Sequence, residues 1–261
     1  MGVIATDKWL EEGCQHRKIG KKLKPYFPGR NENLIFSKLI DHGIYRSTSG
    51  CQEMVKLLQK QKTWEFINTE SEKLKKIWGG PDVPIFIFPS DSSSLRLQKE
   101  HGGKSGLAYS DKLFLFLTPE VGPTDIKALL MHEYHHICRI QKNPKPEPEY
   151  TLEDVVILEG MAENAVRESL GEKPVAKWAK LYKEDQIKHL WKKHIEPNRK
   201  IAQNDPKYEK ILYGKGFYPA MAGYAAGYYI VKKYMSSSQS TTKDILSIPA
   251  VKIIQTVFPD V

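Results

Sequence analysis

The chain has 261 residues, of which 40% are hydrophobic and 27% charged. These values are typical of a globular protein with a substantial core, and they exclude a disordered or collagen-like chain. Lys and Arg outnumber Asp and Glu by 40 to 31, but no arginine-rich or recognition-helix motif accompanies the basic C-terminal third, so we expect no nucleic-acid binding.

Apolar runs, the first residues and the cysteines indicate where in the cell the protein is expected. No apolar run approaches the ~20 residues of a transmembrane helix, so we expect no membrane span. The first residues, MGVIATDKWLEEG, lack the pattern of a secretory signal. Cys14, Cys51 and Cys138 are odd in number and widely spaced, which argues against a disulfide framework. We therefore expect a cytoplasmic protein in which Cys138 is a small core residue.

Residues 1–80 are predicted to be largely helical. Apolar residues recur at helical spacing before a stop at Gly79-Gly80-Pro81, namely Met54, Leu57, Leu58, Trp64 and Ile67. A short strand is expected in VPIFIFP (83–89). A polar loop containing Gly102 and Gly103 follows, and 106–117 then predicts a strand, a turn at Ser110-Asp111 and a second strand.

Helices dominate the rest of the chain. One is expected from Thr124 to about Gln141, ending before the prolines of NPKPEPE. The next begins at Thr151, which forms the pattern of a capping box with Asp154. Further helices are expected near 174–183, 185–203, 218–235 and 241–256, with SSSQSTT (236–242) as a linker. The predicted fold is α+β, divided into a helical N-terminal region, 1–80, and a domain, 81–261.

The stretch MHEYHHI carries the strongest chemical signal. His132, Glu133 and His136 form H-E-x-x-H within a predicted helix that is otherwise apolar. Residues i and i+4 share one helix face, so both imidazoles can bind one tetrahedral Zn²⁺. Glu133 is then beside the open coordination position, where it can act as general base toward a water. His135 is out of register, and we expect it, like His101, to be a surface or packing residue.

A catalytic zinc needs a third protein ligand. Glu159 and Glu163 are one turn apart on a largely apolar helix face in VVILEGMAENAVRE. The simplest assignment makes Glu159 the third ligand. Glu163 would accept the free ring N–H of a ligand histidine, with His132 favoured, and so orient that ring. The alternative for Glu163, an ordinary exposed glutamate, remains open.

HEYHH followed by EGMAE resembles the gluzincin metallopeptidases. Together with FIFPSD, GGKSGLAY, LEGMAEN and PAMAGYAAGYYIVKKY, it is similar to the YjaZ-like family of predicted Zn-dependent proteases. The resemblance implies a zincin-like fold, with a small strand layer packed on the H-E-x-x-H helix. It also implies one Zn²⁺ per chain and a peptide or protein substrate.

A peptidase of this kind also needs a group that stabilises the oxyanion of the tetrahedral intermediate. Tyr224 and Tyr228 in AGYAAGYY are the candidates, although tyrosines at helical spacing are often core residues. Gly223 and Gly227 have the same spacing and would let this helix pack closely. Further contenders for the oxyanion role are Tyr213, His189 and His194. An extended substrate is expected to add to the strand at 106–109.

The sequence thus predicts a zinc metallopeptidase of gluzincin type in which Glu133 activates water held by the metal. Two alternatives stand beside it. One is a non-catalytic interaction protein that keeps the fold and uses its basic C-terminal helices. The other is a small-amide metallohydrolase.

Overall fold

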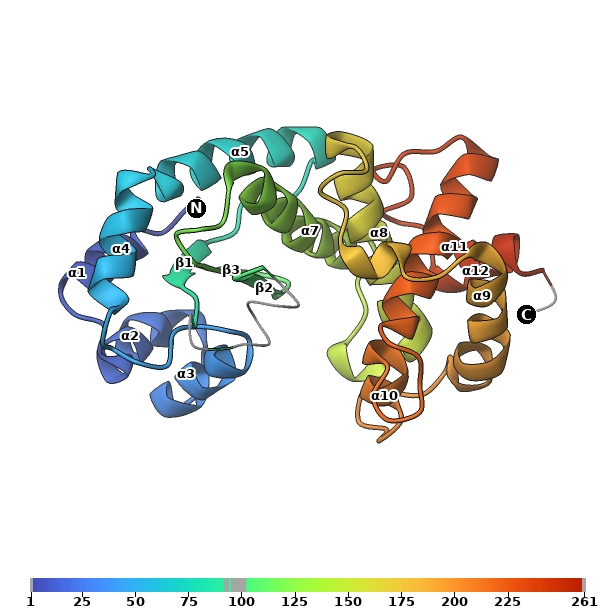
Figure 1. Ribbon diagram of the computed structural model, residues 1–261, viewed down its shortest axis with the longest axis horizontal. Helices are drawn as coiled ribbons and strands as arrows, with labels where there is room; N and C mark the ends of the chain where they lie inside the picture. The colour runs from blue at the N-terminus through green and yellow to red at the C-terminus, as the bar shows by residue number, and fades with distance from the viewer. Residues whose placement is uncertain (1, 92–93, 95–101, 260–261) are drawn as a thin grey trace. The chain divides into compact units, whose positions relative to one another are not determined.

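The computed structural model of the protein describes residues 2–91, 94 and 102–259 (Figure 1). The chain forms two compact units, residues 1–137 and 138–261, and their boundary falls inside helix α7 (Pro123–Lys142). Helices surround one small sheet in the first unit, and the described part of the second unit is helical, which agrees with the predicted α+β class. None of the described helices has the length and apolar composition of a membrane span.

The sheet has three strands in the order β1 (Ile85–Pro89), β3 (Leu113–Leu117) and β2 (Lys104–Ala108). β1 runs parallel to β3, and β2 runs antiparallel to it. β1 and β3 are buried along their whole length, whereas β2 lies at an edge and is half-buried. The predicted strands are confirmed. Much of the predicted polar loop, with His101, lies outside the described residues.

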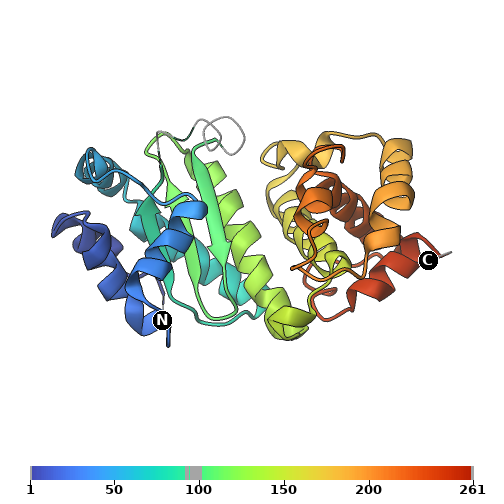
Figure 2. The ribbon, with the colours of Figure 1, turned by 90° about the horizontal axis from the view of Figure 1, so that it is seen from below.

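The two faces of this sheet contact different helices, because successive side chains of a strand point to opposite sides. One face carries a row of phenylalanines, Phe86, Phe88, Phe114 and Phe116. These residues share a core with α1 (Thr6–Glu11), α2 (His16–Leu23), α3 (Glu32–Asp41) and α4 (Cys51–Lys60). On the opposite face α7 follows β2, with Lys104 paired to Asp125 and Gly106 against Glu133 (Figure 2).

The predicted helical lead-in is confirmed, although the long stretch before Gly79 forms two helices. α4 ends at Lys60, and α5 (Thr63–Trp78) begins after Lys62, which has a left-handed backbone conformation. Gly79 then ends α5 in the same left-handed conformation, as helix C-termini favour. Leu57 departs from the expected core pattern, because its side chain is 41% exposed.

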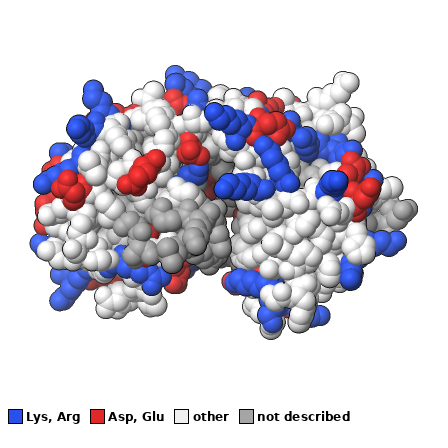
Figure 3. All heavy atoms as spheres, in the orientation of Figure 1, with Lys and Arg blue, Asp and Glu red and all other residues white. Residues whose placement is uncertain are grey.

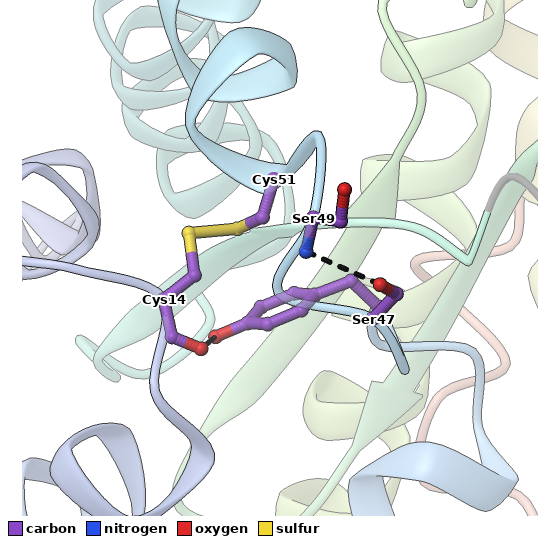
Figure 4. The surroundings of a disulfide bond; sticks show 5 residues. Cys14, Ser47, Ser49 and Cys51 are labelled. Atoms are coloured by element: carbon purple, nitrogen blue, oxygen red, sulfur yellow. Dashed lines mark hydrogen bonds between the residues drawn. A yellow bond between two sulfur atoms is a disulfide. The ribbon is translucent and has the colours of Figure 1, made fainter.

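The expectation that the cysteines are unpaired is wrong. Cys14, ahead of α2, forms a disulfide with Cys51, the first residue of α4 (Figure 4). Both residues are buried in the N-terminal core, and the buried Tyr45 hydroxyl donates to the Cys14 carbonyl over 3.0 Å. The pairing depends on a contact across 37 residues, which spacing alone does not reveal. Cys138 takes no part in this disulfide and is buried in the core, as predicted.

Two helices form the centre of the second unit, α8 (Leu152–Leu170) and α11 (Ala222–Ser238). Their backbones touch at two glycines. A Cβ atom on Gly160 would lie 2.2 Å from the Gly227 carbonyl oxygen, and one on Gly227 would lie 1.9 Å from that of Val156. The buried Asn164 amide donates to the carbonyls of Gly160 and Tyr228, which joins the helices further. The predicted close packing of the glycine-spaced helix is confirmed.

The remaining C-terminal boundaries differ from the prediction. The expected helix near 174–183 is a short 3-10 turn, and that near 185–203 is interrupted by a π-helical turn and by Pro197 in another 3-10 turn. The regular helix in the second of these segments is α9 (Glu184–Leu190). A further helix, α10 (Tyr208–Tyr213), was not predicted. α11 continues into the expected linker, and the last helix, α12 (Ala250–Val257), starts only after Pro249.

The positive charge of the C-terminal region is partly paired. The Lys232 Nζ atom lies 3.2 Å from the Glu172 Oε1 atom, and the Lys233 Nζ atom lies 3.0 Å from the Glu184 Oε2 atom. On the face shown in Figure 3, acidic side chains lie among the basic ones. This distribution is typical of solvated helix faces, and the absence of nucleic-acid binding stays a prediction.

Candidate metal centre

Helix α7 presents the H-E-x-x-H residues on one side. The rings of His132 and His136 lie one turn apart, with centroids 4.7 Å apart and planes nearly perpendicular. Tyr134 and His135 turn toward the end of α5. The buried Tyr134 hydroxyl donates to the Pro81 carbonyl over 2.8 Å, and the His135 ring packs edge-on against Trp78 at 5.1 Å. These packing contacts determine the rotation of α7 about its axis.

Helix α8 supplies the carboxylate expected as third ligand. His132, His136 and Glu159 each offer one ligand atom, and these atoms all lie within 4.8 Å of one another. Ligands of a tetrahedral zinc at ~2.0–2.1 Å are separated by roughly 3.4 Å, so a small movement of the side chains would close the group around the ion. The donors fit a zinc site of two imidazoles and one carboxylate.

The position of α8 has local causes. The Asp154 carboxylate accepts a hydrogen bond from the Thr151 backbone N–H, as in the predicted capping box, and further ones from the Thr151 hydroxyl and from Lys145. Burial alone would raise the pKa of Asp154, but these hydrogen bonds outweigh it and lower the pKa. One residue beyond Glu159, Gly160 holds α8 against α11. Glu159 is thus in a helix restrained at its start and in its middle.

Glu133 lies against the edge strand. A Cβ atom on Gly106 would lie 2.3–2.5 Å from the Glu133 Cγ, Cδ and Oε1 atoms, so any side chain at 106 would occupy the space of this carboxylate. Gly106 was not among the predicted site residues. The signal was present in GGKSGLAY, because a glycine inside a strand often marks a close approach of the backbone to another group.

Glu163 is buried, with a relative exposure of 4%. One of its oxygens accepts a 2.6 Å hydrogen bond from the backbone N–H of Ala176. The alternative that it is an ordinary exposed glutamate is therefore wrong. Its predicted hydrogen bond to the His132 ring stays a prediction.

Tyr213 and Tyr224 form a pair in the second unit. Their ring centroids lie 5.6 Å apart, and the ring planes are inclined by 32°. Burial raises the pKa of Tyr213; the neighbouring Tyr224 hydroxyl opposes this shift, whereas the charge of Glu159 adds to it. This influence shows that Tyr213 lies near the expected third ligand.

The other oxyanion candidates have different surroundings. The Tyr228 side chain is buried, and its hydroxyl has no hydrogen-bond partner among the described residues. Burial raises the pKa of Tyr228 to about 12. His194 packs edge-on against Tyr218, and the exposed His189 lines a surface recess with Lys188, Lys192 and Lys193.

A family described as predicted Zn-dependent protease (DUF2268) matches residues 63–255. The chain belongs to this family. It is 39% identical to the uncharacterized protein YjaZ of Bacillus subtilis (strain 168), over 96% of this chain and 97% of the relative. It is also 22% identical to the uncharacterized protein YjfC of the same strain, over 89% and 82% of the two chains. The matched segment contains the sheet, the H-E-x-x-H residues and Glu159.

Proposed function

We propose that the protein is a zinc-dependent peptidase of gluzincin type with a zincin-like fold. The observation that carries this proposal is the combination of a His-His-Glu donor group with a non-ligand carboxylate, Glu133, beside an edge strand. A structural zinc site would not need that carboxylate. The family description, predicted Zn-dependent protease, supports the same conclusion.

His132, His136 and Glu159 would hold one zinc ion. When bound, zinc supplies Lewis acidity, which lowers the pKa of a water toward ~7 and polarises a carbonyl oxygen. Glu133 removes the proton from the attacking water and then gives it to the leaving nitrogen of the peptide. The Tyr224 hydroxyl donates a hydrogen bond to the oxyanion that forms at the carbonyl. We favour Tyr224 over Tyr228 because its partner Tyr213 lies near Glu159, whereas the Tyr228 hydroxyl is buried.

The substrate would lie along β2. β2 pairs with β3 on one side only, and no described strand pairs with its other edge. Hydrogen bonds near both ends of the ladder use Gly103 and Tyr109. Because an antiparallel strand turns alternate residues to each side, Lys104, Gly106 and Ala108 direct their backbone groups to the open edge. An extended peptide paired there would lie beside Glu133.

The test compares the parent protein with Glu133→Gln and His132→Ala, using zinc content and cleavage of a peptide library. The parent should carry one zinc per chain and cleave peptides. Glu133→Gln should keep the zinc and lose roughly 10²–10⁴-fold in rate, because it lacks the general base. His132→Ala should lose the metal. The exposed His189 offers a matched control, since His189→Ala should change neither property.

Two results would contradict the proposal. Zinc retained at full stoichiometry in His132→Ala would reject the ligand assignment. Equal peptide cleavage by the parent and Glu133→Gln would show that Glu133 is not the base. A zinc protein that cleaves no peptide would indicate the non-catalytic alternative, and cleavage of small amides alone would indicate the small-amide hydrolase.

A cytoplasmic location was expected partly because the cysteines were predicted to be unpaired. Cys14 and Cys51 form a disulfide, so this argument no longer supports that location.

A further inference from the structure

The loop between α10 and α11 exposes a large aromatic side chain (Figure 1). Phe217, near the middle of this loop, is 93% exposed, whereas the other exposed large hydrophobic side chains among the described residues reach 41–66%. A phenylalanine in water forgoes the free energy that its burial would give. Its nearly complete exposure therefore needs a cause in the structure of the loop.

Backbone contacts at the base of the loop provide that cause. The Met221 N–H donates to the Tyr213 carbonyl over 3.0 Å. A Cβ atom on Gly214 would lie 2.1 Å from the Pro219 carbonyl oxygen, so the two ends of the loop touch. Gly214 has a φ of 73°, which glycine adopts without strain. The residues between these ends project as a closed loop that carries Phe217.

Basic side chains lie beside the projecting loop. The Tyr218 ring packs edge-on against His194, with centroids 5.5 Å apart, and so brings the loop beside the π-helical turn that carries Lys192 and Lys193. Both lysines are exposed, and neither has an ion pair within the part of the chain that the structure describes. Their charges are therefore available to a partner of the loop.

The surroundings of these two lysines favour an anionic partner. Lys192 and Lys193 line a surface recess with Lys188 and His189, and none of the described residues that line it is acidic. Lys188 and Lys215 are each paired with a glutamate, at 2.9 and 2.8 Å. Residues 171–261 contain 16 Lys and Arg but only 8 Asp and Glu. The charge beside the loop thus complements a negatively charged surface.

We propose that this loop and the adjoining lysines bind the surface of an anionic lipid bilayer. Phe217 enters the boundary between head groups and acyl chains, and Tyr218 stays at the level of the head groups. Lys192 and Lys193 contact the lipid phosphates. A stable protein interface needs about 800 Å² from each partner around an apolar centre, whereas a bilayer can close around a single projecting side chain. This binding does not depend on the proposed peptidase function.

The binding test is cosedimentation of the full chain with vesicles of equimolar phosphatidylcholine and phosphatidylglycerol, and with vesicles of phosphatidylcholine alone. The parent should prefer the anionic vesicles, and added salt should weaken its binding. Phe217→Ser should lower the partition coefficient roughly 10–100-fold, the effect of burying one phenylalanine side chain. Lys192→Gln combined with Lys193→Gln should lower it about 25-fold, at about fivefold for each lysine near an anionic surface.

The N-terminal unit offers matched controls. Leu34 is 66% exposed, and Lys56 and Lys60 on α4 are exposed lysines without an ion pair among the described residues. Leu34→Ser should leave vesicle binding unchanged, and so should Lys56→Gln combined with Lys60→Gln. Every variant should unfold at the temperature of the parent, because each replaced side chain is exposed.

A second measurement reports whether residue 217 enters the bilayer. Phe217→Trp should keep the parental binding, because it replaces one large aromatic side chain by another. Its emission should be quenched more strongly than that of the parent by phosphatidylcholine brominated on the acyl chains. Leu34→Trp adds a tryptophan at an exposed position of the N-terminal unit and should show no additional quenching.

The proposal is overturned if the parent binds neither kind of vesicle, or binds both equally. Binding that survives Phe217→Ser and the paired lysine changes would place the lipid contact elsewhere on the molecule. Absence of additional quenching in Phe217→Trp would exclude insertion of the loop. Binding of a single-stranded oligonucleotide instead of vesicles, weakened by the same variants, would identify a nucleic-acid surface and likewise overturn the assignment to a bilayer.

Discussion

Replacing Gly106 by alanine should disable Glu133 while leaving the fold and the metal site intact. Gly106 lies in β2, and its φ is not positive, so alanine can adopt the same backbone conformation. The new methyl group would lie 2.3 Å from Glu133 Cγ and 2.5 Å from Oε1. Both are atoms of a flexible side chain. The collision is therefore relieved by moving the carboxylate rather than the strand.

The size of the effect follows from these distances. Non-bonded carbon atoms are at rest about 3.5 Å apart, so the Glu133 side chain must move by roughly 1 Å. A displacement of that size in a catalytic group costs on the order of 10²-fold in rate. The free energy of unfolding should change by less than ~1 kcal/mol, because the gain from replacing a strand glycine offsets the cost of a strained rotamer.

The assay measures kcat, zinc content and thermal unfolding for Gly106→Ala and for Gly122→Ala. A Cβ atom on Gly122 meets no atom within 4 Å, and Gly122 has no positive φ, so this control tests a glycine-to-alanine change without a collision. We expect kcat to fall about 100-fold in Gly106→Ala alone, with zinc content unchanged. Parental kcat in a folded, zinc-loaded Gly106→Ala would refute the placement of Glu133 as the base.

Three further changes test the architecture around the site. The double change of Cys14 and Cys51 to serine should lower the free energy of unfolding by about 4 kcal/mol for a 37-residue loop, measured by urea denaturation, and should abolish the effect of a reductant on stability. Asp154→Ala should cost about 1 kcal/mol at neutral pH. The folded pKa of Asp154 is lowered, so its contribution is present above pH ~4 and lost as pH falls through the folded pKa; the difference from the parent, measured by denaturation across pH, should shrink there. Gly227→Ala should lower the free energy of unfolding by ~1–3 kcal/mol or more, because its Cβ would meet the Val156 backbone, which cannot rotate away; full stability would contradict the helix contact.

The sequence by itself determined the local features of this protein. The spacing of His132 and His136 places both on one face of a helix whatever surrounds it, because helical periodicity is a property of neighbouring residues. The apolar runs that became β1 and β3 and the Thr151–Asp154 cap depend on the same short range. The predicted helix boundaries were wrong after residue 171, where prolines and turns interrupt the helical pattern.

Only the tertiary structure decided which distant residues meet. Cys14 pairs with Cys51, Gly106 meets Glu133, and Tyr213 meets Tyr224. None of these contacts follows from the composition of either segment. Each depends on how strands, helices and loops far apart in the chain pack, and a close-packed interior allows a neighbour only where space remains. The metal-ligating pair in α7 is therefore visible in the sequence, whereas the side chains that orient the chemistry around it become visible only in the fold.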